Sequence, residues 1–175
     1  MKLNMSIAMV HNPLHSSFLE QMPFFGGIRP SIIELILSHS SPLAKAAEEY
    51  FFIENEIANS MFLLTDGEVE IIKAYNHKNY QLSHLIAGDC FGEMAIIEHN
   101  IRSASVKALT NCTAIEISND CLGEVYLADI KQFALLQMNM SREVSRRLRE
   151  ANELLFRAQI ENEMYSKKLA ATKLA

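Results

Sequence analysis

The sequence predicts a mainly β protein with flanking helices: a jelly roll or other closed β-sandwich, followed by one long helix. Three observations point to this class. All four prolines lie in the first quarter of the chain. Short apolar runs alternate with turn-forming residues from about residue 46 to residue 117, and neither glycine nor proline occurs beyond Gly123. We therefore expect short helices first, then strands, then helix.

Two helices are expected before the strands. The segment from Ser17 to Met22 is long enough for one or two helical turns. Ser31 then offers an N-terminal cap for a second helix. This second helix would bury large aliphatic side chains, namely Ile32, Ile33, Leu35, Ile36 and Leu37.

The middle of the chain has the regular punctuation of a β-sandwich. Turns are expected at Glu54-Asn55, Asp66-Gly67, Tyr75 to Asn79 and Gly88-Asp89. Asparagine tolerates a left-handed backbone, so the turn at Asn55 needs no glycine. Strands are expected at Met61 to Leu64, Val69 to Ala74, Tyr80 to Ile86, Ser103 to Ala108 and Thr113 to Ile117.

The C-terminal helix has the pattern of a coiled coil. Steps of four and three residues join Val144, Leu148, Ala151, Leu155, Ala158, Asn162, Tyr165 and Leu169. A polar Asn162 on this seam favours a paired, in-register dimer. The pattern predicts a parallel homodimer; the alternative is a helix packed along its own sandwich.

Composition narrows the function. The net charge of −5 and the isoelectric point near 5.7 argue against a nucleic-acid-binding surface for the whole domain. Three widely spaced cysteines, Cys90, Cys112 and Cys121, fit reduced thiols, and Cys90 and Cys112 are expected to pack as small apolar residues in strands. The chain lacks an apolar run long enough for a bilayer and a convincing signal peptide, so the prediction is a cytoplasmic protein without a membrane partner.

The segment Phe91-Gly92-Glu93-Met94-Ala95, followed by Arg102-Ser103-Ala104-Ser105-Val106, has the chemistry of a small anion site. Gly92 lets a backbone approach closely, and a helical turn starting near it would aim free N–H groups at a phosphate. Arg102 offers a rigid fork of donors, and Glu93 can accept from a ribose hydroxyl. Taken alone, Arg102 could instead pair with a surface carboxylate, and Glu93 could cap the helix.

These two pieces resemble the phosphate-binding cassette of the cyclic nucleotide-binding domain family, which includes catabolite activators and regulatory subunits of cAMP-dependent kinase. The resemblance extends over roughly residues 18 to 165. It includes the segment from Phe52 to Val69, Ala87-Gly88-Asp89 before the cassette, and Ser145 to Asn152.

The resemblance implies a purine cyclic nucleotide as ligand, cAMP first and cGMP as the alternative, with no further cofactor. It implies ligand contacts at Phe91, Gly92, Glu93, Met94, Ala95, Arg102, Ser103, Ala104 and Asn152. Where catabolite activators read adenine with a Thr-Ser pair, this chain has Ala151 and Asn152, and this difference leaves the base preference open.

The domains expected are an N-terminal tail at residues 1–15, a cyclic nucleotide-binding β-roll with its N-terminal helices at 16–127, and a coiled-coil-like helix at 128–175. The predicted function is a non-enzymatic receptor. It would act as a homodimer on an unknown downstream protein, without direct DNA binding, because the chain stops at Ala175, too soon for a helix-turn-helix domain.

Three alternatives stay open: a ligand-free dimeric scaffold, the N-terminal fragment of a catabolite-activator-like regulator, and a metal-dependent cupin. The six histidines argue against the cupin because they are scattered, with His77 in an expected hairpin turn.

Overall fold

The computed structural model describes residues 18–98 and 101–172. The predicted tail at residues 1–15 lies outside these ranges, as do His11, His15 and His99. The chain divides into two compact units, one ending at Met140 and the other beginning at Ser141.

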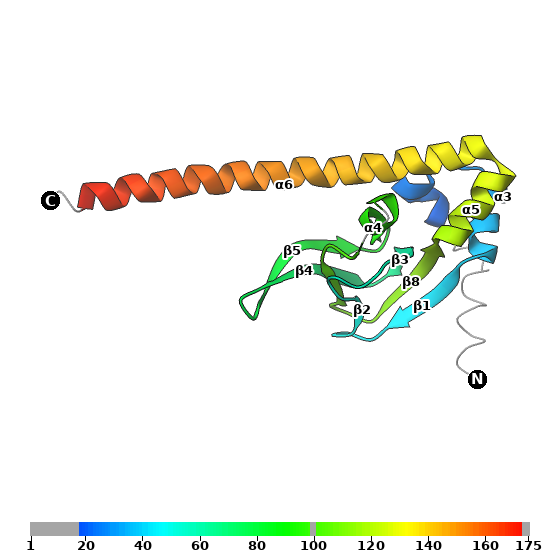
Figure 1. Ribbon diagram of the computed structural model, residues 1–175, viewed down its shortest axis with the longest axis horizontal. Coiled ribbons are helices and arrows are strands. Elements are labelled where there is room, and N and C mark those ends of the chain that lie inside the picture. The colour runs from blue at the N-terminus through cyan, green and yellow to red at the C-terminus, as the bar shows by residue number, and fades with distance from the viewer. Residues whose placement is uncertain (1–17, 99–100, 173–175) are drawn as a thin grey trace. The chain divides into compact units, whose positions relative to one another are not determined.

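In the described part of the first unit, eight strands form two antiparallel four-stranded sheets (Figure 1). One sheet has the order β1-β8-β3-β6 and the other the order β2-β7-β4-β5. The strands are β1 (Ser41–Lys45), β2 (Tyr50–Phe52), β3 (Ser60–Asp66), β4 (Glu68–Tyr75), β5 (Lys78–Ile86), β6 (Cys90–Phe91), β7 (Ser105–Ala108) and β8 (Cys112–Ser118). This arrangement confirms the predicted β-sandwich of the jelly-roll type.

All five predicted strands are present, but one begins later than expected. Strand β7 starts at Ser105 rather than Ser103, because residues 103 and 104 form a bend after the isolated bridge between Ile57 and Ile101. No bounds were predicted for strands β1, β2 and β6, although Cys90 of β6 was expected to lie in a strand. β1 contains Pro42, which an edge strand tolerates, and β1 pairs only with β8.

Two of the predicted turns contain non-glycine residues with a left-handed backbone. Asn55 has a φ of 73°, so asparagine does take the place of glycine in this turn. Asn76 and His77, with φ values of 48° and 60°, connect β4 to β5. This pair of positive φ angles is typical of a two-residue hairpin loop, and it confirms that His77 lies in a turn.

Helices precede, interrupt and follow the strands along the chain. Residues 18–21 are helical, and the others are η1 (Pro23–Phe25), α3 (Pro30–Ser38), α4 (Glu93–Glu98), α5 (Asn119–Ala128) and α6 (Ile130–Thr172). Ser31 does not cap α3. Pro30 is already the first helical residue, and the cap position is Arg29, which makes no side-chain cap hydrogen bond. The hydroxyl of Ser118 does cap α5, accepting from Cys121 N at 3.1 Å.

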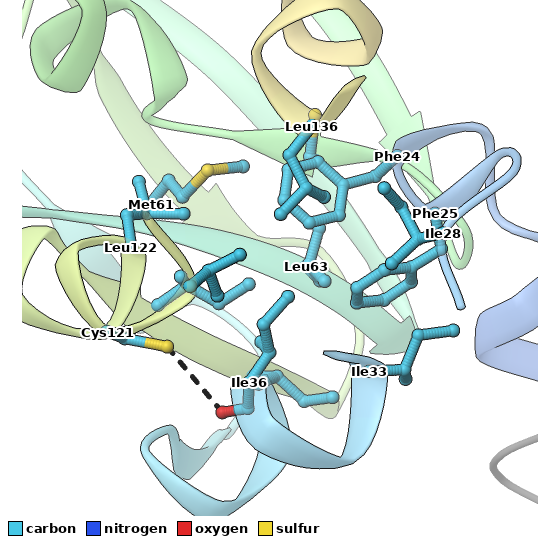
Figure 2. Close-up of a cluster of buried hydrophobic side chains, with 14 of the residues drawn as sticks. Phe24, Phe25, Ile28, Ile33, Ile36, Met61, Leu63, Cys121, Leu122 and Leu136 are labelled. Carbon is cyan, nitrogen blue, oxygen red and sulfur yellow. Dashed lines mark hydrogen bonds between the residues drawn. The ribbon is translucent and has the colours of Figure 1, made fainter. Parts of the chain in front are cut away.

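Two hydrophobic cores hold the first unit together. One fills the space between the sheets and includes Phe52, Phe62, Val69, Phe91 and Val106. The other packs helical side chains against side chains of the sheet that contains β3, as Figure 2 shows. This second core joins elements that are distant in sequence, through Phe24, Phe25, Ile28, Ile33, Ile36, Met61, Leu63, Cys121, Leu122 and Leu136.

The cysteines behave as predicted. All three are free and buried. The thiol of Cys121 donates to the Ile36 carbonyl oxygen at 3.6 Å (Figure 2), and burial raises the pKa of this thiol. Such a thiol stays protonated and weakly nucleophilic at neutral pH.

The second unit is the C-terminal part of α6. Three residues of the predicted seam, Leu148, Leu155 and Tyr165, are exposed in the single chain, whereas Val144 of the seam is half-buried. Two ion pairs join side chains four residues apart on this helix: Glu143 with Arg147 at 3.0 Å and Glu153 with Arg157 at 3.1 Å. Within the described residues, no helix is both long enough and apolar enough to cross a bilayer.

Candidate functional site

The cassette, residues 91–106, starts with a tight change from strand to helix. Gly92 follows β6 with a φ of 78°, a conformation that side chains disfavour, and α4 begins at the next residue. A Cβ atom at Gly92 would lie 2.6 Å from Nη1 of Arg102 and 3.2 Å from a ring carbon of Phe52. Glycine is therefore required here both by the backbone and by the close approach of the guanidinium.

Arg102 is a buried cation, with only 5% of the residue exposed. Its Nη1 donates to the carbonyl oxygen of Gly92 at 3.1 Å, and its Nη2 donates to the hydroxyl of Ser60 at 3.3 Å. These two hydrogen bonds to described residues leave donors of the five-donor guanidinium for another acceptor. The surface-pairing alternative for Arg102 is therefore wrong.

Aromatic rings support the guanidinium from the core. Its Cζ atom lies 4.0 Å from the ring centroid of Phe52 and 5.6 Å from that of Phe62. The rings of Phe62 and Phe91 stack at 5.3 Å beside them. The cation thus sits on the aromatic part of the core between the sheets, where a planar group can stack without losing its in-plane donors.

The electrostatics of Arg102 are those of a partly compensated buried charge. Burial lowers the pKa of the guanidinium from its ordinary value, and the nearby carboxylates of Glu116, Glu56 and Glu93 oppose that shift. Glu93, the first residue of α4, is itself only 3% exposed. A buried cation and a buried carboxylate therefore lie within the same small region.

Backbone hydrogen bonds hold the segment that follows the cassette helix. Arg102 N donates to Glu56 O at 2.8 Å, and Arg102 O accepts from Asn55 N at 2.9 Å. Because the N–H and C=O of a trans peptide point in opposite directions, the Arg102–Ser103 peptide directs the N–H of Ser103 away from Asn55. The turn after β2 thus fixes the orientation of the Ser103 amide.

The other predicted contact residues differ in exposure. Phe91 and Ala95 are buried, at 1% and 4% exposed, and belong to the packed interior. Met94 is 42% exposed, Ser103 is exposed, and Ala104 is buried. Asn152 lies in the second unit, where its side chain is exposed, so its contact with a base stays a prediction.

Three residues at the site were not among the predicted contacts: Ser60, Phe52 and Phe62. Ser60 begins the buried strand β3, and its small polar side chain at the head of an apolar run was the available indication. Phe52 and Phe62 look like ordinary core residues in the sequence. Only the fold shows that both contact the guanidinium.

Comparisons with known proteins agree with this geometry. The family model for the cyclic nucleotide-binding domain matches residues 44–129. The cyclic AMP receptor protein of Thermus thermophilus is 28% identical over 131 residues, which cover 74% of this chain and 59% of that protein. The cAMP-dependent protein kinase regulatory subunit of Schizosaccharomyces pombe is 31% identical over 97 residues, or 55% and 23% of the two chains. This chain thus spans at most about three fifths of these relatives.

Solved structures show the same fold. The crystal structure of the Thermus thermophilus catabolite activator protein has a TM-score of 0.65 and 27% identity, over 78% of this chain and 63% of that one. A cyclic nucleotide-binding domain from Methylobacillus flagellatus has a TM-score of 0.74 at 18% identity, over 86% and 94%. Together with the family match, these likenesses show that residues 44–129 of this chain form a cyclic nucleotide-binding domain.

Proposed function

We propose that the first unit is a receptor for a purine 3′,5′-cyclic monophosphate, with cAMP as the preferred ligand and no chemistry done on it. The observation that carries the proposal is the buried Arg102 guanidinium next to the left-handed Gly92 backbone. The names of two relatives from different kingdoms, a cyclic AMP receptor and a cAMP-dependent kinase regulatory subunit, support cAMP over cGMP.

Each part of the ligand has a candidate partner. The cyclic phosphate carries one negative charge, which the remaining donors of Arg102 and the amides of residues 93 and 103 would bind. The carboxylate of Glu93 would accept from the ribose 2′-hydroxyl, and the hydroxyl of Ser103 would donate to the phosphate. Asn152, or the same residue of a second copy, would contact the base.

The output we propose is a population shift. Ligand would favour the arrangement of α6 with which it makes the better contacts, and α6 would present this change to a protein partner. Three exposed apolar side chains of the second unit, Leu148, Leu155 and Tyr165, lie on the predicted seam and support a parallel homodimer.

A titration calorimetry experiment on the full chain tests the receptor. It compares cAMP, cGMP and 5′-AMP, which carries the same base but an open phosphate. We expect saturable one-to-one binding per chain for cAMP, weaker binding for cGMP, and much weaker binding for 5′-AMP. Equal affinity for cAMP and 5′-AMP would contradict recognition of the cyclic phosphate.

One observation favours a second candidate, a ligand-free scaffold. Protein atoms, the carbonyl of Gly92 and the hydroxyl of Ser60, already accept hydrogen bonds from the guanidinium. In that case Arg102 would be a structural cation, and the titrations would show no heat with either cyclic nucleotide.

A further inference from the structure

We propose that the ion pair between Glu54 and Lys73 positions the phosphate-binding segment, residues 102–104. This inference rests on the proposed function. The Nζ atom of Lys73, on β4, lies 3.2 Å from Oε1 of Glu54 and donates to the carbonyl oxygen of Ser103 at 3.1 Å. One ammonium group thus connects the turn after β2 to the irregular segment before β7.

The contact at Ser103 fixes a second peptide group. Because this carbonyl faces Lys73, the N–H of Ala104 in the same trans peptide points to the opposite side of the chain. The preceding peptide is held in the same way by Asn55, whose N–H donates to the carbonyl of Arg102. Ser103 therefore has an anchored peptide group on each side, although its own side chain is exposed.

Glu54 fixes the position of the Lys73 ammonium, because an exposed lysine side chain is not held in one conformation by itself. The side chain of Lys73 is 52% exposed, whereas that of Glu54 is only 19% exposed. The backbone N–H of Glu54 donates to the hydroxyl of Ser105 at 2.9 Å, and its Oε2 accepts from Ala74 N at 3.4 Å. Glu54 is thus bonded to β7 through its backbone and to β4 through its carboxylate, and this carboxylate restrains the ammonium against Ser103.

A simpler role for Lys73 is long-range attraction of an anionic ligand. The two roles predict different signs for the two partners. Attraction alone predicts that loss of Lys73 weakens binding and that loss of Glu54 strengthens it. The first change removes a positive charge near the anionic ligand, and the second removes a negative charge. Positioning predicts that both losses weaken binding, because either one releases the Ser103 carbonyl.

The test measures cAMP affinity by titration calorimetry for Lys73→Met, Glu54→Ala and Lys73→Arg. Lys107→Met is the matched control. It removes a lysine of the same sheet that pairs with Glu70 at 2.9 Å and Glu48 at 3.2 Å. We expect Lys73→Met and Glu54→Ala each to weaken binding about three- to tenfold, with partial rescue in Lys73→Arg and less than about a twofold change in the control. Tighter binding by Glu54→Ala, or equal effects of Lys73→Met and Lys107→Met, would overturn the proposal.

A second measurement does not depend on the ligand. In amide nitrogen NMR spectra of the ligand-free chain, Lys73→Met should shift the Ser103 and Ala104 resonances, and Lys107→Met should leave them in place. Unshifted resonances in Lys73→Met would overturn the positioning role. A wild-type chain that binds neither cAMP nor cGMP would instead remove the proposed function, while the amide spectra still decide whether Lys73 orients this segment.

Discussion

Replacing Arg102 by methionine tests whether this cation serves ligand binding or the stability of the fold. Methionine keeps an unbranched chain of similar length and places a thioether, in place of the charge, against the ring of Phe52, now 4.0 Å from the guanidinium carbon. If Arg102 serves the ligand, the variant should fold normally and bind poorly. If Arg102 serves the fold, the variant should lose stability.

The stability change in the absence of ligand follows from opposing effects. The variant loses hydrogen bonds to the Gly92 carbonyl and the Ser60 hydroxyl, each worth about 0.5–1.5 kcal/mol net. It also relieves a buried charge, whose desolvation costs several kcal/mol even after relaxation. Burial is the dominant influence on the pKa of Arg102, and it exceeds the attraction of Glu116, Glu56 and Glu93. These effects oppose one another, and we therefore expect the free energy of unfolding to change by less than about 3 kcal/mol.

The affinity change should be much larger. Loss of a desolvated partner for the phosphate weakens binding by about 2–5 kcal/mol, or about 30-fold to several thousandfold. Urea unfolding followed by circular dichroism gives the first quantity, and calorimetry with cAMP gives the second. A loss of more than about 3 kcal/mol in unfolding free energy with cAMP affinity unchanged would refute this reasoning and favour the scaffold.

Four further predictions concern other parts of the chain. Gly92→Ala should lower unfolding free energy by about 1–2 kcal/mol from the left-handed φ alone and should also weaken cAMP binding, because the new methyl group displaces the guanidinium; urea unfolding and calorimetry measure both. Glu93→Gln should weaken cAMP binding less than Glu93→Ala, and either change should matter little for 2′-deoxy-cAMP. Leu148→Asp combined with Leu155→Asp should give monomers in sedimentation, whereas persistent dimers would place the contact elsewhere. Asn139→Ala should lower unfolding free energy by about 2 kcal/mol or more, because Asn139 is 5% exposed and its amide group donates to two backbone carbonyls at 2.9 and 3.0 Å.

Local sequence patterns predicted the elements whose determinants lie close together in the chain. The β4–β5 hairpin was recognisable because its loop residues, Asn76 and His77, accept positive φ angles. The turn at Asn55 was predictable for the same reason. The bounds of strand β6 were not predictable, because its two residues pair only with the middle of β3, Phe62 with Phe91 and Leu63 with Cys90. No local pattern identifies so short a strand.

In the candidate site too, residues close together in the sequence could be predicted, and residues that are distant in the sequence could not. Gly92, Glu93 and Arg102 could be predicted together because they lie within one short stretch of sequence. The groups that contact the guanidinium outside this stretch, Phe52 and Ser60, could not. They are 50 and 42 residues away from Arg102, and they meet it only because β2 and β3 belong to different sheets of one sandwich.

The buried cation also gives the proposed coupling a physical route within the first unit. Arg102 is bonded to the carbonyl of Gly92, the residue directly before α4, so a phosphate that competes for this guanidinium acts on the start of α4. Ile96 of α4 belongs to the same hydrophobic core as Leu136 and Met140, which lie near the beginning of α6 and are fully buried. Closely packed side chains do not absorb a shift of one neighbour without moving another. A displacement of α4 should therefore reach the N-terminal part of α6 through this core. The proposed coupling can then begin without a contact between the ligand and the C-terminal part of α6.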